Sequence, residues 1–427
     1  MSAANLPKKA SIETILAQAG IRYQEITSIS SRDIIPPLHL STTFERDIDG
    51  TYSNGFVYSR HDHPTRALLE KVMTDIEEGA EWSAAFASGM QAATVLLQAF
   101  GANAYLILPN DLYQGIRILV RSTFEEWGLR NECVDMTDLG AVKEIMDRVF
   151  ADAGTSRVLV WMESPSNPLL KVTDVRAIVA LARHYSKKHG KDFLSILDTT
   201  WHSPFLLQAL LPLGIDITYG SATKFLGGHS DLLAGVITGR KRKALVSGGG
   251  GMVDLEIPVR HLQQTMGGGL APFDCWLLLR GLKTLPCRMR THCENAQKLS
   301  RFFETHPRIS VVHFPGLESH PGHGLHRAMM RKEGMDGSML SIQMKGEEGG
   351  TEDETAVEEE VFKVLARLKI FRRATSLGAT ESLCEHRRSV EGPLSQTPRN
   401  LVRISVGLEG YEDLEEDWRQ ALSEEGS

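Results

Sequence analysis

Three groups of residues have types and spacing suited to binding an aldehyde, a cationic ring nitrogen and a phosphate. Lys224 lies among hydroxyls, glycines and apolar residues in the stretch from Ser221 to Ser230. An apolar setting lowers the pKa of a lysine, which suits it to Schiff-base chemistry with an aldehyde. Asp198 directly follows an apolar run, and the carboxyl end of a buried strand is where α/β sheets place functional carboxylates.

A phosphate site is predicted beside these two residues. The run Ser88-Gly89-Met90 opens a predicted helix, whose free N–H groups and dipole favour an anion. Ser221 and Thr223 add hydroxyls next to Lys224. Taken alone, Ser88-Gly89 is more commonly an ordinary N-cap, and Asp198 is equally well a helix or turn cap. Together the groups match pyridoxal 5'-phosphate (PLP), which carries an aldehyde, a ring nitrogen and a phosphate.

The elements that must position these residues follow from the apolar pattern. Predicted strands cover residues 105–108, 158–162, 193–197, 215–219 and 232–237. They alternate with predicted helices, and several are continuously apolar, which indicates an α/β fold with a mainly parallel sheet covered on both faces. A long helical pattern over 273–306 is interrupted by Pro286, which we expect to kink or split it.

Beyond that helix, strands at 309–314, 338–344 and 401–406 alternate with helices at 356–367 and 411–423, which predicts a smaller α/β domain. We therefore expect an N-terminal arm (1–63), a cofactor-binding large domain (64–265) and a C-terminal small domain (266–427). The acidic run 346–360 is predicted to be a solvated loop entering a helix.

Composition excludes several classes of protein. The 427 residues carry a formal net charge of −7, without the basic excess that a nucleic-acid-binding surface needs. Five scattered cysteines favour reduced thiols over a disulfide framework or a metal site. The sequence shows neither a run of about 18 apolar residues nor a signal peptide. We expect a cytoplasmic protein that binds no metal, nucleic acid or membrane.

Further motifs follow one another from Leu40 nearly to the C-terminus. They are Tyr58-Ser59-Arg60 with Pro64-Thr65, Ser88-Gly89-Met90, Asp111-Leu112-Tyr113, 163–168, 221–228, 280–285, Ser376-Leu377-Gly378 and 403–409. In this order they resemble the PLP-dependent trans-sulfuration family of cysteine and methionine metabolism, and among its members most of all the cystathionine γ-synthases. The resemblance implies an aspartate-aminotransferase-like fold, in which the large domain has a seven-stranded, mostly parallel sheet.

The resemblance also implies residue roles. Lys224 would be the Schiff-base lysine and proton carrier, Asp198 would keep the ring nitrogen protonated, and Tyr113 would stack on the ring. The phosphate would be bound by Ser88, Gly89, Met90, Ser221 and Thr223, and from a neighbouring subunit by Tyr58 and Arg60. The predicted substrate-binding residues are Asn167, Thr375, Ser376 and Arg403. An arm that reaches a neighbour's site implies a homodimer, usually paired into a homotetramer.

The sequence departs from the family pattern at places that affect the substrate rather than the cofactor. His63 and Thr199 each replace an Asn, and Gln114 replaces a Gly after Tyr113. Thr375 stands where bacterial γ-synthases and γ-lyases have Glu. The usual His-Pro-Ala is His386-Arg387-Arg388, whose arginines either contact an acidic substrate or, the expected case, are solvated.

Three functions remain open at the level of sequence. The first is γ-replacement on an O-acylated homoserine, in which a nucleophile such as cysteine adds at Cγ. The second is a cystathionine or methionine lyase, which uses the same catalytic residues. The third is a catalytically silent oligomeric relative, against which the presence of both Lys224 and Asp198 argues.

Overall fold

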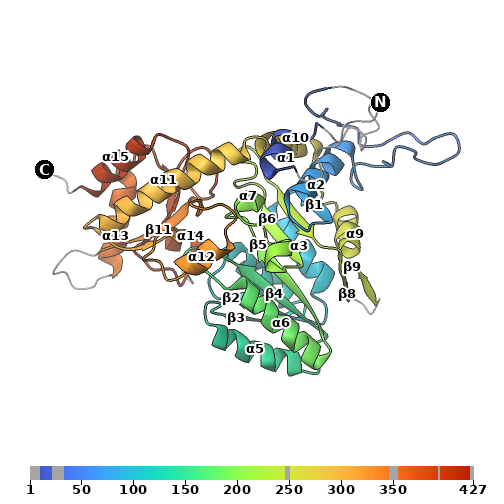
Figure 1. Ribbon diagram of the computed structural model, residues 1–427, viewed down its shortest axis with the longest axis horizontal. Coiled ribbons are helices and arrows are strands. Elements are labelled where there is room, and N and C mark those ends of the chain that lie inside the picture. The colour runs from blue at the N-terminus through green and yellow to red at the C-terminus, as the bar shows by residue number, and fades with distance from the viewer. Residues whose placement is uncertain (1–9, 22–32, 246–250, 346–353, 393–394, 424–427) are drawn as a thin grey trace. The chain divides into compact units, whose positions relative to one another are not determined.

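The computed structural model describes residues 10–21, 33–245, 251–345, 354–392 and 395–423. The chain forms two compact units, coloured by residue number in Figure 1. The first unit comprises 1–110, 115–163 and 174–286, and the second comprises 111–114, 164–173 and 287–427. Two short segments, Asp111–Gln114 and Ser164–Thr173, therefore belong to the second unit although the chain on either side of them belongs to the first.

The elements follow the predicted alternation of strands and helices. Up to residue 286 they begin, in order, as α1 (Ile12–Ala17), α2 (Pro64–Ile76), β1 (Trp82–Phe86), α3 (Gly89–Phe100), β2 (Ala104–Pro109), α4 (Gln114–Leu119), the π-helical turn η2 (Val120–Phe124), β3 (Arg130–Val134), α5 (Leu139–Ala151), β4 (Arg157–Glu163), α6 (Val175–His189), β5 (Asp192–Asp198), α7 (Ser203–Leu206), α8 (Leu210–Leu213), β6 (Ile217–Ser221), β7 (Gly235–Gly239), β8 (Lys243–Leu245), β9 (Met252–Asp254), α9 (Glu256–Met266), α10 (Pro272–Leu282) and α11 (Leu285–Thr305). The later elements are β10 (Ile309–His313), α12 (His323–Met329), β11 (Met339–Met344), α13 (Glu354–Arg367), β12 (Arg372–Arg373), β13 (Leu383–His386), α14 (Arg387–Glu391), β14 (Leu401–Ser405) and α15 (Tyr411–Leu422).

A seven-stranded sheet forms the centre of the first unit, in the order β1-β7-β6-β5-β4-β2-β3. Strands β2 to β6 run parallel, and β7 pairs antiparallel with both β6 and β1. The predicted mainly parallel sheet is confirmed. Every residue of β4 is buried, as expected of a strand covered on both faces.

Register brings the ends of three strands to one edge of this sheet. Gly235 at the start of β7 pairs with Phe86 at the end of β1 and with Ser221 at the end of β6. A Cβ on Gly235 would lie 2.3 Å from the carbonyl oxygen of Ser88, so only glycine allows this approach. The start of α3 is thereby held close to the end of β6.

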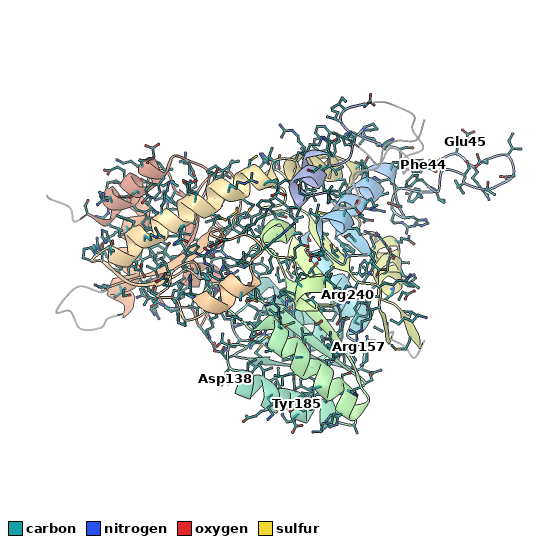
Figure 2. All side chains as sticks on the ribbon, viewed as in Figure 1. Phe44, Glu45, Asp138, Arg157, Tyr185 and Arg240 are labelled. Atoms are coloured by element: carbon teal, nitrogen blue, oxygen red, sulfur yellow. The ribbon has the colours of Figure 1, made fainter. Side chains whose placement is uncertain are left out.

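Helix α6 packs against β5 of the sheet, and α5 packs against α6 (Figure 1). Asp138 caps α5 by accepting from two N–H groups, and Gly190 ends α6 in the left-handed conformation (φ 64°). Tyr185 of α6, labelled with Asp138 in Figure 2, stacks on Phe150 of α5 at 6.1 Å between ring centroids. At the amino ends of the strands, Arg157 pairs with Asp192 at 3.0 Å.

The second unit is built on a five-stranded sheet in the order β10-β11-β14-β13-β12. Its core includes Trp418 of α15, which packs edge-on against Phe303 and Phe371 with ring centroids 5.0 and 5.5 Å apart. Pro286 divides the long helical pattern as expected, because α10 ends at Leu282 and Pro286 lies in the first turn of α11. The acidic run enters α13, although its first part, 346–353, lies outside the described residues.

Candidate active site

Asp198 and Lys224 lie at the carboxyl edge of the seven-stranded sheet. Asp198 is the last residue of β5 and pairs in register with Tyr219 of the neighbouring strand β6. Strand β6 ends at Ser221, and the main-chain N–H of Lys224 donates to the Ser221 carbonyl at 3.2 Å in the turn that follows. The first unit thus brings the two predicted residues to the ends of adjacent strands.

Thr200 links these two strand ends. Its main-chain N–H donates to Oδ1 of Asp198 at 2.9 Å, and its Oγ1 accepts from the main-chain N–H of Ser221 at 2.9 Å. Burial raises the pKa of Asp198 to about 6, while hydrogen bonds from the Thr200 side chain and main chain act in the opposite direction. With a pKa near 6, Asp198 is mostly ionised at neutral pH.

The start of α3 and the end of β6 make a cradle for an anion. Ser88 is the N-cap of α3, and its Oγ accepts from the N–H of Gln91 at 3.0 Å. A Cβ on Gly89 would lie 3.0 Å from Cβ and 3.3 Å from Cα of Ser221, so any larger residue would need Ser221 to move by a few tenths of an ångström. The Thr223 hydroxyl accepts from the Ala234 N–H at 3.0 Å, which fixes its position.

These residues fit PLP. The Asp198 side chain is 6% exposed, and among the described residues it has no cationic partner, so a ring nitrogen carrying a proton would complete its charge. The N-terminus of α3 presents N–H groups, and Met90 follows Gly89 within its first turn. The donor set therefore matches a phosphate at one end and a protonated pyridine at the other.

A second group of predicted residues meets in the second unit. Arg403 on β14 is 4% exposed, and its Nη1 donates to Oδ1 of Asn167 at 3.2 Å. Its Nη2 donates to the main-chain oxygen of Ser376 at 3.3 Å and pairs with Oε1 of Glu385 at 2.5 Å. Burial lowers the pKa of Arg403 to about 10, so the guanidinium remains charged at neutral pH. This is an arrangement suited to a carboxylate.

Strain and exposure mark the neighbours of Arg403. Ser376 has φ 89°, a conformation that non-glycine residues adopt rarely and mostly at functional sites. Thr375 is exposed beside it. Tyr113 is 40% exposed and belongs to the segment Asp111–Gln114 of the same unit. The second unit thus gathers Tyr113 with the predicted substrate-binding residues.

The prediction that Arg387 is solvated is wrong. It is 4% exposed, because its guanidinium donates to Glu385 and to Glu391 at 2.9 Å each. Arg388, the next residue, is half-buried and donates to the main-chain oxygen of Thr397 at 2.9 Å. The carboxylates of Glu385 and Glu391 account for the deeper burial of Arg387 compared with Arg388.

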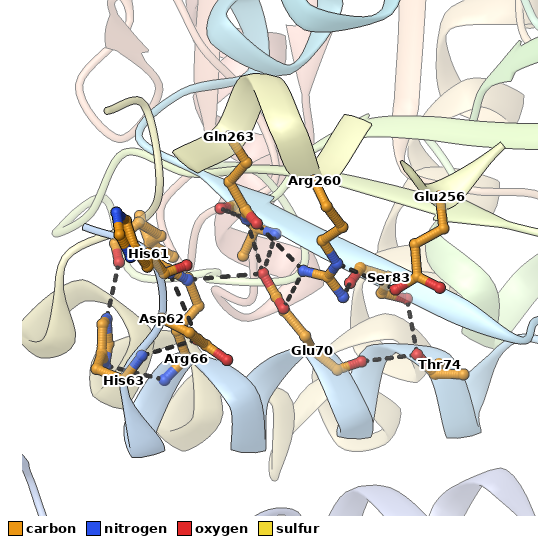
Figure 3. A network of polar contacts seen from close by, with 12 residues as sticks. His61, Asp62, His63, Arg66, Glu70, Thr74, Ser83, Glu256, Arg260 and Gln263 are labelled. Atoms are coloured by element: carbon orange, nitrogen blue, oxygen red, sulfur yellow. Dashed lines mark hydrogen bonds and ion pairs between the residues drawn. The ribbon is translucent and has the colours of Figure 1, made fainter. Parts of the chain in front are cut away.

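The end of the N-terminal arm is fixed by Arg66 of α2, as Figure 3 shows. Arg66 is 2% exposed and donates to the main-chain oxygens of His61 at 2.6 Å and Ser59 at 3.4 Å. Arg60, between them, lies 5.6 Å from the ring centroid of Tyr58 and donates to a main-chain carbonyl of α9 at 2.5 Å. Tyr58 and Arg60 are both exposed and held together.

Glu70 holds α2 against α9 and β1 in the same network (Figure 3). Its Oε1 accepts from the Ala85 N–H at 2.7 Å and from Gln263 at 2.9 Å, and its Oε2 pairs with Arg260. The charge of Glu70, which is 5% exposed, is therefore compensated within the first unit.

His63, where the family usually has Asn, is the N-cap of α2. Its Nδ1 accepts from the Arg66 N–H at 3.2 Å, which leaves Nε2, 3.2 Å from the Leu270 carbonyl oxygen, as the donor to that oxygen. Burial, and then the charge of Arg66, lower the pKa of His63 to about 4. The ring is thus neutral at pH 7, with its proton on Nε2.

Some residues that shape the site were not predicted. Thr200 follows Asp198 by two positions at a strand end, the spacing at which an aspartate accepts from the main chain, and this spacing is a usable signal. No comparable sequence signal predicted the contacts made by Glu385, Glu391 and Gln114. These contacts join parts of the second unit that lie far apart in the sequence or depend on how its strands pair.

Similarity to known proteins decides the family. A model described as "Cys/Met metabolism PLP-dependent enzyme" matches residues 13–423. The chain belongs to this family. Within the Cys/Met metabolism family, it is 34% identical to cystathionine beta-lyase of Coxiella burnetii (98% of this chain, 100% of that one). It is 36% identical to cystathionine gamma-synthase of Mycobacterium leprae (91% of each chain).

A solved structure agrees with these relatives. The crystal structure of metB from Corynebacterium glutamicum has a TM-score of 0.83 at 32% identity, covering 98% of this chain and 99% of that one. The fold and the PLP cofactor predicted from the sequence are thereby confirmed. The chain is a PLP-dependent enzyme of cysteine and methionine metabolism, either a γ-synthase or a carbon–sulfur lyase.

The described residues add two observations. None of the described helices is long and apolar enough to cross a membrane. The described part of the chain contains no group of three or more His, Cys, Asp or Glu placed to hold a metal ion.

Proposed function

We propose that the enzyme catalyses γ-replacement on an O-acylated homoserine, with cysteine or another nucleophile adding at Cγ. The observation that carries the proposal is the similarity to the mycobacterial cystathionine gamma-synthase over most of both chains. The buried Arg403, with Asn167 and Ser376 around it, supplies the recognition of an α-carboxylate that an amino-acid substrate requires.

The roles of the chain's own residues follow from their positions. When bound, PLP supplies an electron sink that stabilises negative charge at the substrate Cα. Asp198 would keep a proton on the ring nitrogen, and Gly89 and Ser221 would bind the phosphate. Nζ of Lys224 carries protons among Cα, Cβ and Cγ of the substrate. Arg403 holds the α-carboxylate, where a charge-assisted hydrogen bond contributes roughly 1.5–3 kcal/mol.

A second candidate is a cystathionine or methionine lyase. Thr375 favours a β-lyase in particular, because an exposed, uncharged hydroxyl stands where bacterial γ-synthases and γ-lyases carry Glu. The similarity to the Coxiella beta-lyase over the whole of that chain supports the same alternative. Synthase and lyase would share Lys224, Asp198 and Arg403, so their products, rather than these residues, distinguish them.

We propose further that Tyr58 and Arg60 bind the cofactor phosphate of a neighbouring subunit in a cytoplasmic homodimer or homotetramer. Their exposure and the fixed main chain around Arg60 support this role. Mixing the inactive variants Lys224→Ala and Arg60→Ala tests it. A hybrid dimer would contain one site with both residues intact, so activity should return on mixing, and its failure to return would contradict shared sites.

Product analysis tests the main proposal. The purified enzyme is incubated with O-acetyl- or O-succinylhomoserine plus cysteine, and in parallel with cystathionine alone. Formation of cystathionine supports γ-replacement. Release of a thiol and a keto acid from cystathionine supports the lyase, and absence of turnover with any acylhomoserine refutes the first proposal.

Lys224→Ala is the control for these reactions. The wild-type protein should be yellow after incubation with PLP, and the variant should lose that absorption along with all turnover. A wild-type protein that stays colourless would instead favour a catalytically silent relative.

A further inference from the structure

Two departures from the family pattern meet at one residue of the second unit. Gln114 stands where the family has Gly, and its Nε2 donates to the main-chain oxygen of Glu391 at 2.5 Å. Arg387 stands where the family has Pro, and its Nε donates to Oε1 of the same glutamate at 2.9 Å. Gln114, 277 positions before Glu391 in the sequence, thus shares this anchor with Arg387.

Glu391 is well placed to serve as that anchor. Its side chain is 9% exposed, and its Oε2 accepts from the hydroxyls of Ser395 at 2.5 Å and Thr397 at 2.7 Å. The carboxylate therefore has a partner at each oxygen, and its main-chain carbonyl holds Gln114. These contacts fix the position of Glu391.

The other end of Arg387 reaches the counter-ion of Arg403. Its Nη1 donates to Oε1 of Glu385 at 2.9 Å, and this same oxygen pairs with Nη2 of Arg403 at 2.5 Å. The second oxygen, Oε2, is buried and accepts no hydrogen bond from the described residues. Two guanidinium groups therefore share a single carboxylate oxygen in a buried setting.

This sharing changes the charge that a substrate carboxylate meets. Paired with Arg403 alone, Glu385 would neutralise it and repel an incoming carboxylate. Arg387 offsets the charge of Glu385 in this low-dielectric setting, where such an effect is large. Together the two arginines and the two glutamates carry no net charge, but their placement is uneven. Nη1 of Arg387 lies at the Glu385 oxygen that also pairs with Arg403, whereas Glu391 lies at Nε on the other side of Arg387. Arg387 therefore competes locally with Arg403 for Glu385 and weakens the pairing that would oppose a substrate carboxylate.

The residue expected to stack on the cofactor is held by the same network. Asp111 accepts from the Ser166 hydroxyl and from the Leu169 N–H at 3.2 Å, and Gln114 is tied to Glu391. Tyr113 lies between these two attachments. Its segment is therefore fixed at both ends to the unit that contains Arg403.

We propose that Arg387 and Gln114 are positioning residues that act through Glu391, and that Arg387 sets how tightly the enzyme holds the substrate α-carboxylate. The inference rests on the proposed function only in requiring an amino-acid substrate. It does not depend on the acyl group, the nucleophile or the choice between synthase and lyase.

Binding of two matched probes to the PLP-loaded enzyme tests the proposal. L-2-aminobutyrate has an α-carboxylate and no leaving group at Cγ, and propylamine is the same molecule without the carboxylate. Both are titrated by the change they cause in the visible absorption of the cofactor. Arg387→Met should weaken the binding of 2-aminobutyrate by about tenfold or more, as expected for a lost charge-assisted contact. Propylamine should bind within about twofold of wild type.

Three variants complete the experiment. Arg387→Lys keeps the charge and should recover part of the affinity for 2-aminobutyrate. Arg301→Met, which changes an exposed arginine of α11 in the same unit, should alter the binding of neither probe. The double variant Gln114→Gly/Arg387→Met should lose less affinity for 2-aminobutyrate than the product of the fold-losses in the two single variants. Both residues act through Glu391, so their effects should not be independent.

The outcomes separate this inference from the proposed function. Unchanged 2-aminobutyrate affinity in Arg387→Met, or an equal loss for propylamine, would overturn the role of Arg387, and so would an equal effect of Arg301→Met. Independent, multiplicative effects of Gln114→Gly and Arg387→Met would overturn the shared anchor. Neither probe is turned over at Cγ, so failure of γ-replacement leaves this test unaffected.

Discussion

His63 gives stability a pH dependence that the family's usual Asn would remove. The side chain is 1% exposed and neutral, with Nδ1 capping α2 and Nε2 bonded to the Leu270 carbonyl. Replacement by Asn keeps an oxygen that can accept from the Arg66 N–H, as an N-cap requires. The shorter Asn loses the bond to Leu270, which costs about 1 kcal/mol at pH 7.

The sign of the pH effect follows from the direction of the shift. The pKa of His63 is about 4 in the folded protein and about 6.5 in an unfolded chain. The unfolded state therefore binds the proton more tightly, and the stability contributed by neutral His63 is present above pH 6.5 and lost as the pH falls toward 4. Between pH 7 and pH 5 the loss amounts to about 2 kcal/mol.

His63→Asn should therefore be less stable than wild type by about 1 kcal/mol at pH 7 and more stable by about 1 kcal/mol at pH 5. The two stability curves should cross below pH 6. Urea unfolding followed by tryptophan fluorescence at several pH values measures both curves. Other buried histidines, such as His292 with a pKa also lowered to about 4, titrate in both proteins and cancel in the difference.

His261→Asn is the matched control. His261 is exposed on α9, so its replacement should leave the pH dependence of wild type unchanged. A constant stability difference between His63→Asn and wild type from pH 7 to pH 5 would refute the reasoning, because it would mean that His63 does not resist protonation in the folded state.

Three further substitutions test the cofactor site and the core of the second unit. Thr200→Val removes the hydroxyl that lowers the pKa of Asp198; the pKa should rise, and PLP affinity, measured by absorption, should fall by about tenfold and most at acidic pH. Unchanged affinity would show that the Thr200 hydroxyl is dispensable. Gly89→Ala places a Cβ 3.0 Å from that of Ser221; it should cost about 1–3 kcal/mol in urea unfolding and weaken PLP binding, and a neutral result would contradict the close approach. Trp418→Ala leaves a cavity in the second unit and should cost about 3–5 kcal/mol, so a loss below about 1 kcal/mol would contradict its burial.

Much of the site was predictable because chemistry and strand ends coincide in the sequence. Asp198 and Ser221 close two apolar runs, and parallel strands bring their carboxyl ends to one edge. Strand β1 was not predicted from the sequence. Its Ser and Ala residues have little strand preference, and they are buried in a strand that pairs with β7. Strand β3, with Arg, Asn and Glu, is a polar edge strand with no apolar pattern.

Arg387 shows why the carboxylate site was harder to predict. Glu385 and Glu391 flank it closely in the sequence, but glutamates near an arginine are usual on an exposed helix. The burial that turns them into a network comes from β13, which lies between β12 and β14 in the sheet. That placement depends on pairing with β14, and local sequence does not reveal it.

The division of the chain between its two units has a consequence for synthesis on the ribosome. The second unit takes Asp111–Gln114 and Ser164–Thr173 from early in the chain. Asn167 contacts Arg403, 236 residues later, so the carboxylate group cannot assemble until translation is nearly complete. A fragment starting at Cys287 would have Arg403 without Asn167. In the nascent chain the early segments can pair with each other through Asp111, but the contact of Asn167 with β14 forms only after that strand has emerged.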